Sequence, residues 1–171
     1  MFDIIKIDNQ EFHVSIEIDD CIGHPWDEFD CHGPVRESRR PHVEGRSDKS
    51  PGERPLNSAG RNELQFYYDW QGAIAKAKTE GWNAEPFDAP NKALRAVQAD
   101  FDRLRAYLSG DWFYAVVRVM AVDADGNEIA SDVLGGVESD YASEQAHEMA
   151  MDLWHTLRRE SRFADAMACG V

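Results

Sequence analysis

The strict alternation of apolar and polar side chains over residues 12–18 constrains the fold more than any other feature of this sequence. Phe12, Val14, Ile16 and Ile18 alternate with polar residues, which is typical of a strand with one buried face. The four apolar residues among positions 2–7 predict a preceding strand, and the turn-forming residues at 8–11 join the two strands. We therefore expect a β-hairpin over residues 1–20.

The C-terminal part predicts a second hairpin followed by a helix, over residues 111–160. Residues 112–122 are rich in aromatic and β-branched side chains, and Asp125-Gly126 is a strong hairpin-turn signal. The return strand covers about residues 129–137, where Gly135-Gly136 indicates a bulge or the strand end. A helix starting near Asp140 or Ser143 has an apolar face that reaches Leu157.

Residues 63–110 predict one strand and two helices. A short strand at 64–68 leads to Asp69, a suitable N-cap for a helix that Gly81 ends. The second helix lies between Pro90 and Gly110, with apolar residues at three- and four-residue steps: Leu94, Val97, Phe101, Leu104 and Leu108. Residues 21–62 show no periodicity and hold five of the seven prolines, so we expect one long irregular loop there.

These elements predict an α+β fold in a single domain. With 171 residues, the chain is long enough to fold without a disulfide or metal. Strands in adjacent pairs and helices in separate runs favour a mainly antiparallel sheet of about five strands, with the helices on one face.

The distribution of charge is the most informative feature for function. The net charge of −14 disfavours direct nucleic-acid binding, because binding to phosphates requires lysine and arginine. Residues 1–34 carry a net charge of −8, residues 35–62 carry +3, and residues 110–152 carry −9 with Arg118 as their single base. Such a surface is either simply solvated or attracts a cationic partner.

We therefore identify two sets of candidate contact residues. The first set is acidic and is expected to face a basic surface of a partner protein: Asp123, Asp125, Glu128, Asp132, Glu138, Asp140, Glu144 and Glu148. The second set lies in the long loop: Trp26, His32, Arg39 and Arg40. The basic residues between 36 and 54 either neutralise the acidic body or form a partner-binding arm, and the first interpretation is favoured.

No catalytic or cofactor motif is present. The sequence lacks the Gly-x-Ser-x-Gly, phosphate-loop and His-Glu-x-x-His patterns, so we expect neither an enzyme nor a cofactor. Cys21, His24, Cys31 and His32 are weak candidates for a zinc site, since their spacing is uncommon and Cys31 and His32 are adjacent. An odd cysteine count and an N-terminus without a basic region predict a cytoplasmic protein, and no apolar run is long enough for a membrane span.

Several segments resemble small, mostly uncharacterised proteins of tailed bacteriophages and prophages. The resemblance covers most of the chain and is carried by residues 23–35 (GHPWDEFDCHGPV), 51–56, 66–73, 80–82, 112–119 and 134–140. It implies a phage-encoded accessory protein in the bacterial cytoplasm, and it implies no activity or active site.

Three functions follow as hypotheses. The first is non-enzymatic interaction with a host or phage protein that has a basic surface, without direct contact to nucleic acid or membrane. The second is DNA mimicry that inhibits a host nucleic-acid-binding or defence enzyme. The third is a zinc-stabilised module or metal-dependent enzyme that uses the loop from Cys21 to His32.

Overall fold

The structure is a computed structural model, and it describes residues 3–39, 49–58, 64–82 and 91–168. In the last helix, side chains are described up to residue 162. The chain groups into two compact units. Unit 1 comprises Met1–Ile22 and Trp112–Val171, and unit 2 comprises Gly23–Asp111. Both contain helices and antiparallel strands, which confirms the α+β class. Within the described ranges, no helix combines the length and apolar character that crossing a bilayer would require.

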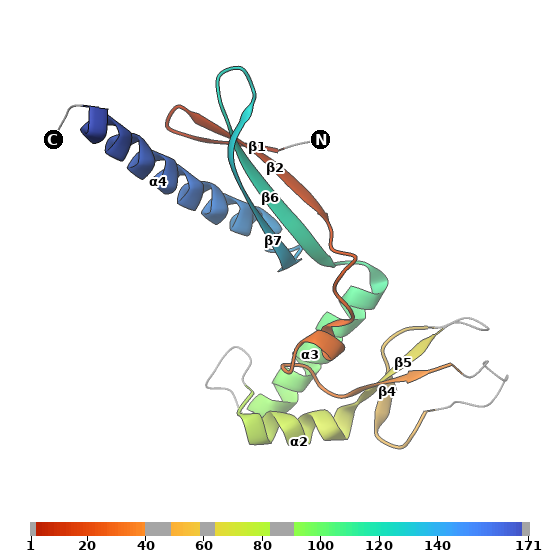
Figure 1. Cartoon of the computed structure of the whole chain (residues 1–171). Coiled ribbons are helices and arrows are strands. Elements are labelled where there is room, and N and C mark those ends of the chain that lie inside the picture. The colour runs from red at the N-terminus through yellow and green to blue at the C-terminus, as the bar shows by residue number, and fades with distance from the viewer. Residues whose placement is uncertain (1–2, 40–48, 59–63, 83–90, 169–171) are drawn as a thin grey trace. The chain divides into compact units, whose positions relative to one another are not determined.

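Unit 1 is a four-stranded antiparallel sheet with one long helix (Figure 1). Its strands are β1 (Asp3–Ile7), β2 (Gln10–Ile18), β6 (Tyr114–Val122) and β7 (Glu128–Glu138), in the order β1-β2-β6-β7. The helix α4 (Ala142–Ala168) packs against all four strands. Unit 2 is therefore inserted between two strands that are neighbours in the sheet, β2 and β6.

The core of unit 1 confirms the predicted alternation. Phe12 and Val14 of β2 are buried together with Val117 and Val119 of β6. The small and flexible residues of α4 cover these side chains: Ala142, Ala146, Met149 and Ala150. Ile18, at the end of β2, departs from the pattern because its side chain is exposed.

Two details of the C-terminal hairpin and helix can be compared with the prediction. The β6–β7 register shifts between Ala115 and Val117, where Gly136 has a φ of +72°, and β7 continues to Glu138. Of the two alternatives at Gly135-Gly136, the structure therefore shows the bulge and not the strand end. The helix begins at Ala142, near the predicted start, but it continues to Ala168 rather than ending at residue 160.

Unit 2 holds a second sheet, which corrects two expectations. β3 (Val35–Ser38) and β4 (Glu53–Pro55) pair with β5 (Gln65–Asp69) in the antiparallel order β3-β5-β4, and α1 (Pro25–Glu28) precedes them. The strands thus form two sheets, whereas one sheet of about five strands was expected. The stretch 21–62 is not one irregular loop, because it contains α1, β3 and β4. Strands of four and three residues are too short to show a period-two pattern, so the sequence did not reveal them.

The two helices of unit 2 form where the sequence predicts them. In α2 (Trp70–Glu80), the Asp69 side chain accepts a hydrogen bond from the Gly72 amide at 3.0 Å, and left-handed Gly81 ends the helix. The helix α3 (Lys92–Ser109) ends at left-handed Gly110, and the predicted start at Pro90 lies outside the described residues. The core residues of α3 are Val97, Phe101 and Leu104, which pack with buried residues of β5 and α2, whereas Leu94 is exposed.

Candidate functional site

Most of the net negative charge belongs to unit 1. Unit 1 contains seventeen acidic and five basic residues, a net charge of −12. Unit 2 contains fifteen acidic and thirteen basic residues, a net charge of −2. The acidic and basic residues of unit 2 therefore nearly balance, whereas those of unit 1 do not.

The eight predicted acidic contact residues lie on consecutive elements of unit 1, and we call them the acidic strip. They follow the β6–β7 turn, β7, the turn after it and the start of α4: Asp123, Asp125, Glu128, Asp132, Glu138, Asp140, Glu144 and Glu148. All are exposed except Glu138, which is half-buried. The fold therefore presents most of these carboxylates to solvent.

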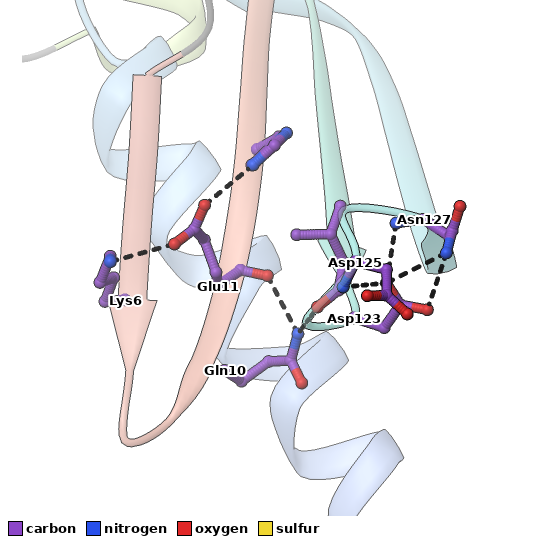
Figure 2. A network of polar contacts seen from close by, with 8 residues as sticks. Lys6, Gln10, Glu11, Asp123, Asp125 and Asn127 are labelled. Carbon is purple, nitrogen blue, oxygen red and sulfur yellow. Dashed lines mark hydrogen bonds and ion pairs between the residues drawn. The ribbon is translucent and has the colours of Figure 1, made fainter.

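Asp123 has an internal role that the sequence analysis did not assign to it. Its carboxylate accepts hydrogen bonds from the backbone amides of Asp125 (2.9 Å) and Asn127 (2.8 Å) and from the Asn127 side chain. Figure 2 shows these bonds closing the β6–β7 turn. The bonds from the backbone and side chain of Asn127 lower the pKa of Asp123. Asp123 thus stabilises its own turn.

A second polar network holds the β1–β2 turn next to the β6–β7 turn (Figure 2). The Gln10 side chain donates hydrogen bonds to the carbonyl oxygens of Val122 (2.6 Å) and Glu11 (3.0 Å). The Glu11 carboxylate lies 3.0 Å from the Lys6 ammonium and 3.0 Å from His13 Nε2, and the Lys6 contact is the largest cause of its lowered pKa.

A hollow of about 350 Å³ lies beside this network, between residues 9–13 and 122–126. The antiparallel order β1-β2-β6-β7 places both turns at the same end of the sheet, so the hollow follows from the topology. The sequence analysis missed it because the pairing of β2 with β6 spans the inserted unit.

One member of the acidic strip is neutralised within its own hairpin. Arg118 Nη2 lies 3.0 Å from the Glu128 carboxylate, and the Ser131 hydroxyl also contacts Glu128. Arg118 is the single lysine or arginine in residues 110–152, so most of the negative charge of that segment is not balanced within it.

β7 is an edge strand with exposed apolar side chains. Among the described strands it pairs with β6 alone, and Ile129, Val133 and Leu134 have exposed fractions of 48%, 55% and 41%. Edge strands offer free backbone donors and acceptors to another chain, and charged residues on them oppose self-association. β7 therefore offers a free backbone edge together with exposed apolar side chains and carboxylates.

The predicted loop contacts have different surroundings from those expected. Trp26 is half-buried and packs against the core of unit 2, with its ring centroid 5.1 Å from that of Phe66. Arg39 is exposed and lies 2.7 Å from Glu37, and Arg40 is outside the described residues. His32 has only 11% of its side chain exposed. Trp26 and His32 thus make internal contacts of unit 2.

His32 belongs to a buried hydrogen-bond cluster around Asp100, which we call the Asp100 cluster. Asp100 Oδ1 lies 2.6 Å from His32 Nδ1, and Oδ2 accepts from the Gly33 amide (2.8 Å) and the Tyr68 hydroxyl (2.7 Å). Burial, and then the Asp100 charge, raise the pKa of Tyr68 far above its usual value. The Lys76 ammonium contacts the carbonyl oxygens of Asp30 and His32.

The Asp100 cluster joins three parts of unit 2: the segment after α1, β5 and α3. With both Asp100 oxygens occupied by donors, its evident role is to fix these segments together. The signal in the sequence was Asp100 itself, since it lies on the apolar stripe of α3, three residues after Val97 and four before Leu104.

The four candidate zinc ligands have separate surroundings. Cys21 and Cys31 are exposed, His32 contacts Asp100, and His24 stacks on Trp26 at a centroid distance of 4.6 Å. Among the residues that the structure describes, no three histidine, cysteine or acidic side chains are arranged to hold a metal ion.

Comparisons of the chain with family models, with curated proteins and with solved structures found no match.

Proposed function

We propose that the chain is a non-enzymatic accessory protein of phage type, which binds a host or phage protein with a basic surface in the bacterial cytoplasm. The acidic strip and the edge of β7 form the binding surface. The association with phage rests on the sequence resemblance, whereas the mode of binding rests on charge and geometry.

The observation that carries the proposal is the large net negative charge of unit 1, compared with the small net charge of unit 2. A net charge of −12 on unit 1 attracts cationic surfaces over a distance set by the Debye length, about 8–10 Å near physiological salt. The same charge opposes pairing of β7 with a second copy of the chain, because like charges would face each other. The exposed Ile129 and Val133 give an approaching basic segment an apolar contact as well.

The experiment is capture of partners from a bacterial lysate by immobilised protein, at about 50 mM and about 300 mM salt. The test variant carries Asp132→Lys and Glu148→Lys, two exposed positions of the acidic strip. The matched control carries Asp3→Lys and Glu17→Lys, which change the charge of unit 1 equally but lie on β1 and β2.

We expect one protein to be retained by the wild type and by the control, to be lost from the test variant, and to be released at the higher salt concentration. Equal loss from both variants would show that total charge, and no particular surface, causes retention. Retention that does not depend on salt would also contradict the proposal.

DNA mimicry is the alternative function, and it can be assessed from the spacing of the acidic residues along α4. Glu144, Glu148 and Asp152 recur every four residues, or about 6 Å along a helix. Duplex DNA presents one charge per about 1.7 Å of axis, so this row has roughly a quarter of that density. A mimic would need β7 carboxylates as well, and its partner would be displaced from the immobilised protein by duplex DNA.

A further inference from the structure

Unit 2 contains a groove that the proposed docking surface does not use. It lies between residues 54–58, at and after β4, and the C-terminal half of α3, with a volume of about 890 Å³. That volume is in the range of small-molecule binding sites. All the lining residues belong to unit 2.

The lining of the groove is apolar in part. Leu56 and Phe101 are buried members of the unit 2 core, and Leu108 packs against the same core. A ligand in the groove would therefore place part of its surface on these side chains and out of water.

Two arginines on opposite sides of the groove have hydrogen-bonding capacity to spare. The Arg54 guanidinium stacks 3.3 Å from the centroid of the Trp70 ring, and the Arg105 guanidinium lies 5.7 Å from the centroid of Phe101. Within the described part of the chain, neither guanidinium is paired with a carboxylate or donates to an acceptor. Stacking on a ring face leaves the in-plane N–H donors of Arg54 available.

Three acceptor side chains of the lining each have a donor within the chain. Asp102 accepts from the Gln98 side chain at 2.8 Å, and Asp111 accepts from the Ser109 hydroxyl at 2.7 Å. The Asn57 oxygen accepts from the Phe66 amide at 2.9 Å. The charged donors of the lining that remain unused among the described residues are thus those of the two guanidiniums, whereas Asp102 and Asp111 keep acceptor sites and their negative charge.

We propose that this groove binds a small ligand that carries an oxyanion, either phosphate or carboxylate, beside an apolar part. Arg54 and Arg105 bind the oxyanion from the two sides, because guanidinium donors match the oxygens of both groups in pairs. The apolar part contacts Leu56, Phe101 and Leu108. The site is independent of the docking proposed for unit 1.

The test is isothermal titration calorimetry of the full chain with three probes: inorganic phosphate, adenosine monophosphate and benzoate. The variants are Arg54→Gln and Arg105→Gln, with Lys78→Gln as the matched control, since Lys78 is an exposed cation of α2 outside the groove. Circular dichroism of each variant checks that the fold is retained, and Arg105→Lys separates charge from guanidinium geometry.

We expect adenosine monophosphate or benzoate to bind, with inorganic phosphate weaker because it lacks an apolar part. Each Arg→Gln change should weaken binding about tenfold or more, as loss of a charge-assisted hydrogen bond does, and Lys78→Gln should leave it unchanged. Stronger binding of adenosine monophosphate than of benzoate identifies a phosphate ligand, and the reverse order identifies a carboxylate. No binding of any probe, or equal weakening by Lys78→Gln, would overturn the proposal.

Discussion

Replacing Asp100 with alanine removes the acceptor that three groups of unit 2 share. His32 Nδ1, the Gly33 amide and the Tyr68 hydroxyl all donate to its carboxylate at 2.6–2.8 Å. The side chain of Asp100 is only 8% exposed, so water cannot readily replace the lost acceptor.

The expected cost follows from the number of donors left without a partner. A buried donor that loses its acceptor costs roughly 1–3 kcal/mol, so three such groups predict a loss of at least about 3 kcal/mol. Tyr68→Phe removes one donor and leaves two bonds to Asp100, which predicts about 1 kcal/mol. Asp102→Ala is the matched control on the same helix, because Asp102 is exposed, and its cost should stay within about 0.5 kcal/mol.

Urea unfolding measures these differences. With a denaturant slope of about 1–3 kcal/mol/M, Asp100→Ala should lower the midpoint of the unit 2 transition by about 1–3 M. Tryptophan fluorescence reports on both units, with Trp26, Trp70 and Trp82 in unit 2 and Trp112 and Trp154 in unit 1. Helical circular dichroism follows the whole chain. A midpoint shift no larger than that of Asp102→Ala would refute the assignment of the Asp100 cluster as the element that fixes unit 2.

Three further predictions concern other parts of the fold. Gly33→Ala should destabilise the chain by about 1–3 kcal/mol in the same assay, since a Cβ at Gly33 would overlap the buried Tyr68 ring, and a neutral result would contradict that packing. The contribution of Asp123 to stability is full above the unfolded-state pKa of about 4 and is lost as pH falls through its folded pKa, which the Asn127 hydrogen bonds lower. Asp123→Ala should therefore flatten the decline of the thermal midpoint below about pH 4, and an unchanged slope would count against this role. Val133→Lys on the edge of β7 should change stability by less than about 0.5 kcal/mol but reduce partner capture, and undiminished capture would exclude that edge from the binding surface.

The sequence predicted the elements whose signals are local and long enough to repeat. β2 showed a period of two over seven residues, and α3 showed an apolar stripe that Gly110 ends. The irregularity at Gly135-Gly136 was also predicted, as a bulge or the strand end, because glycine inside a strand weakens it and often marks a bulge. β3 and β4 could not be predicted, since strands this short form by pairing with β5 and carry no periodic pattern of their own.

The candidate surface was predicted only in part. The uneven charge of residues 110–152 follows directly from counting acidic and basic residues. The internal roles of Asp123 and Glu128 were not visible, because each depends on which donor the turn or the neighbouring strand brings near. The Asp100 cluster was missed for the same reason, as His32 and Asp100 are 68 residues apart.

The sequence alone determined the α+β class, the two outer hairpins and the excess of negative charge, because propensity, periodicity and ionisation act within a few residues. The tertiary structure decided that the strands form two sheets and that nearly all the net charge lies on one unit. It also placed Arg54 and Arg105 beside a groove, where neither guanidinium donates to an acceptor among the described residues. These outcomes depend on contacts between segments that are far apart in the sequence. The burial and hydrogen bonds that stabilise such contacts cannot be read from any short stretch of the chain.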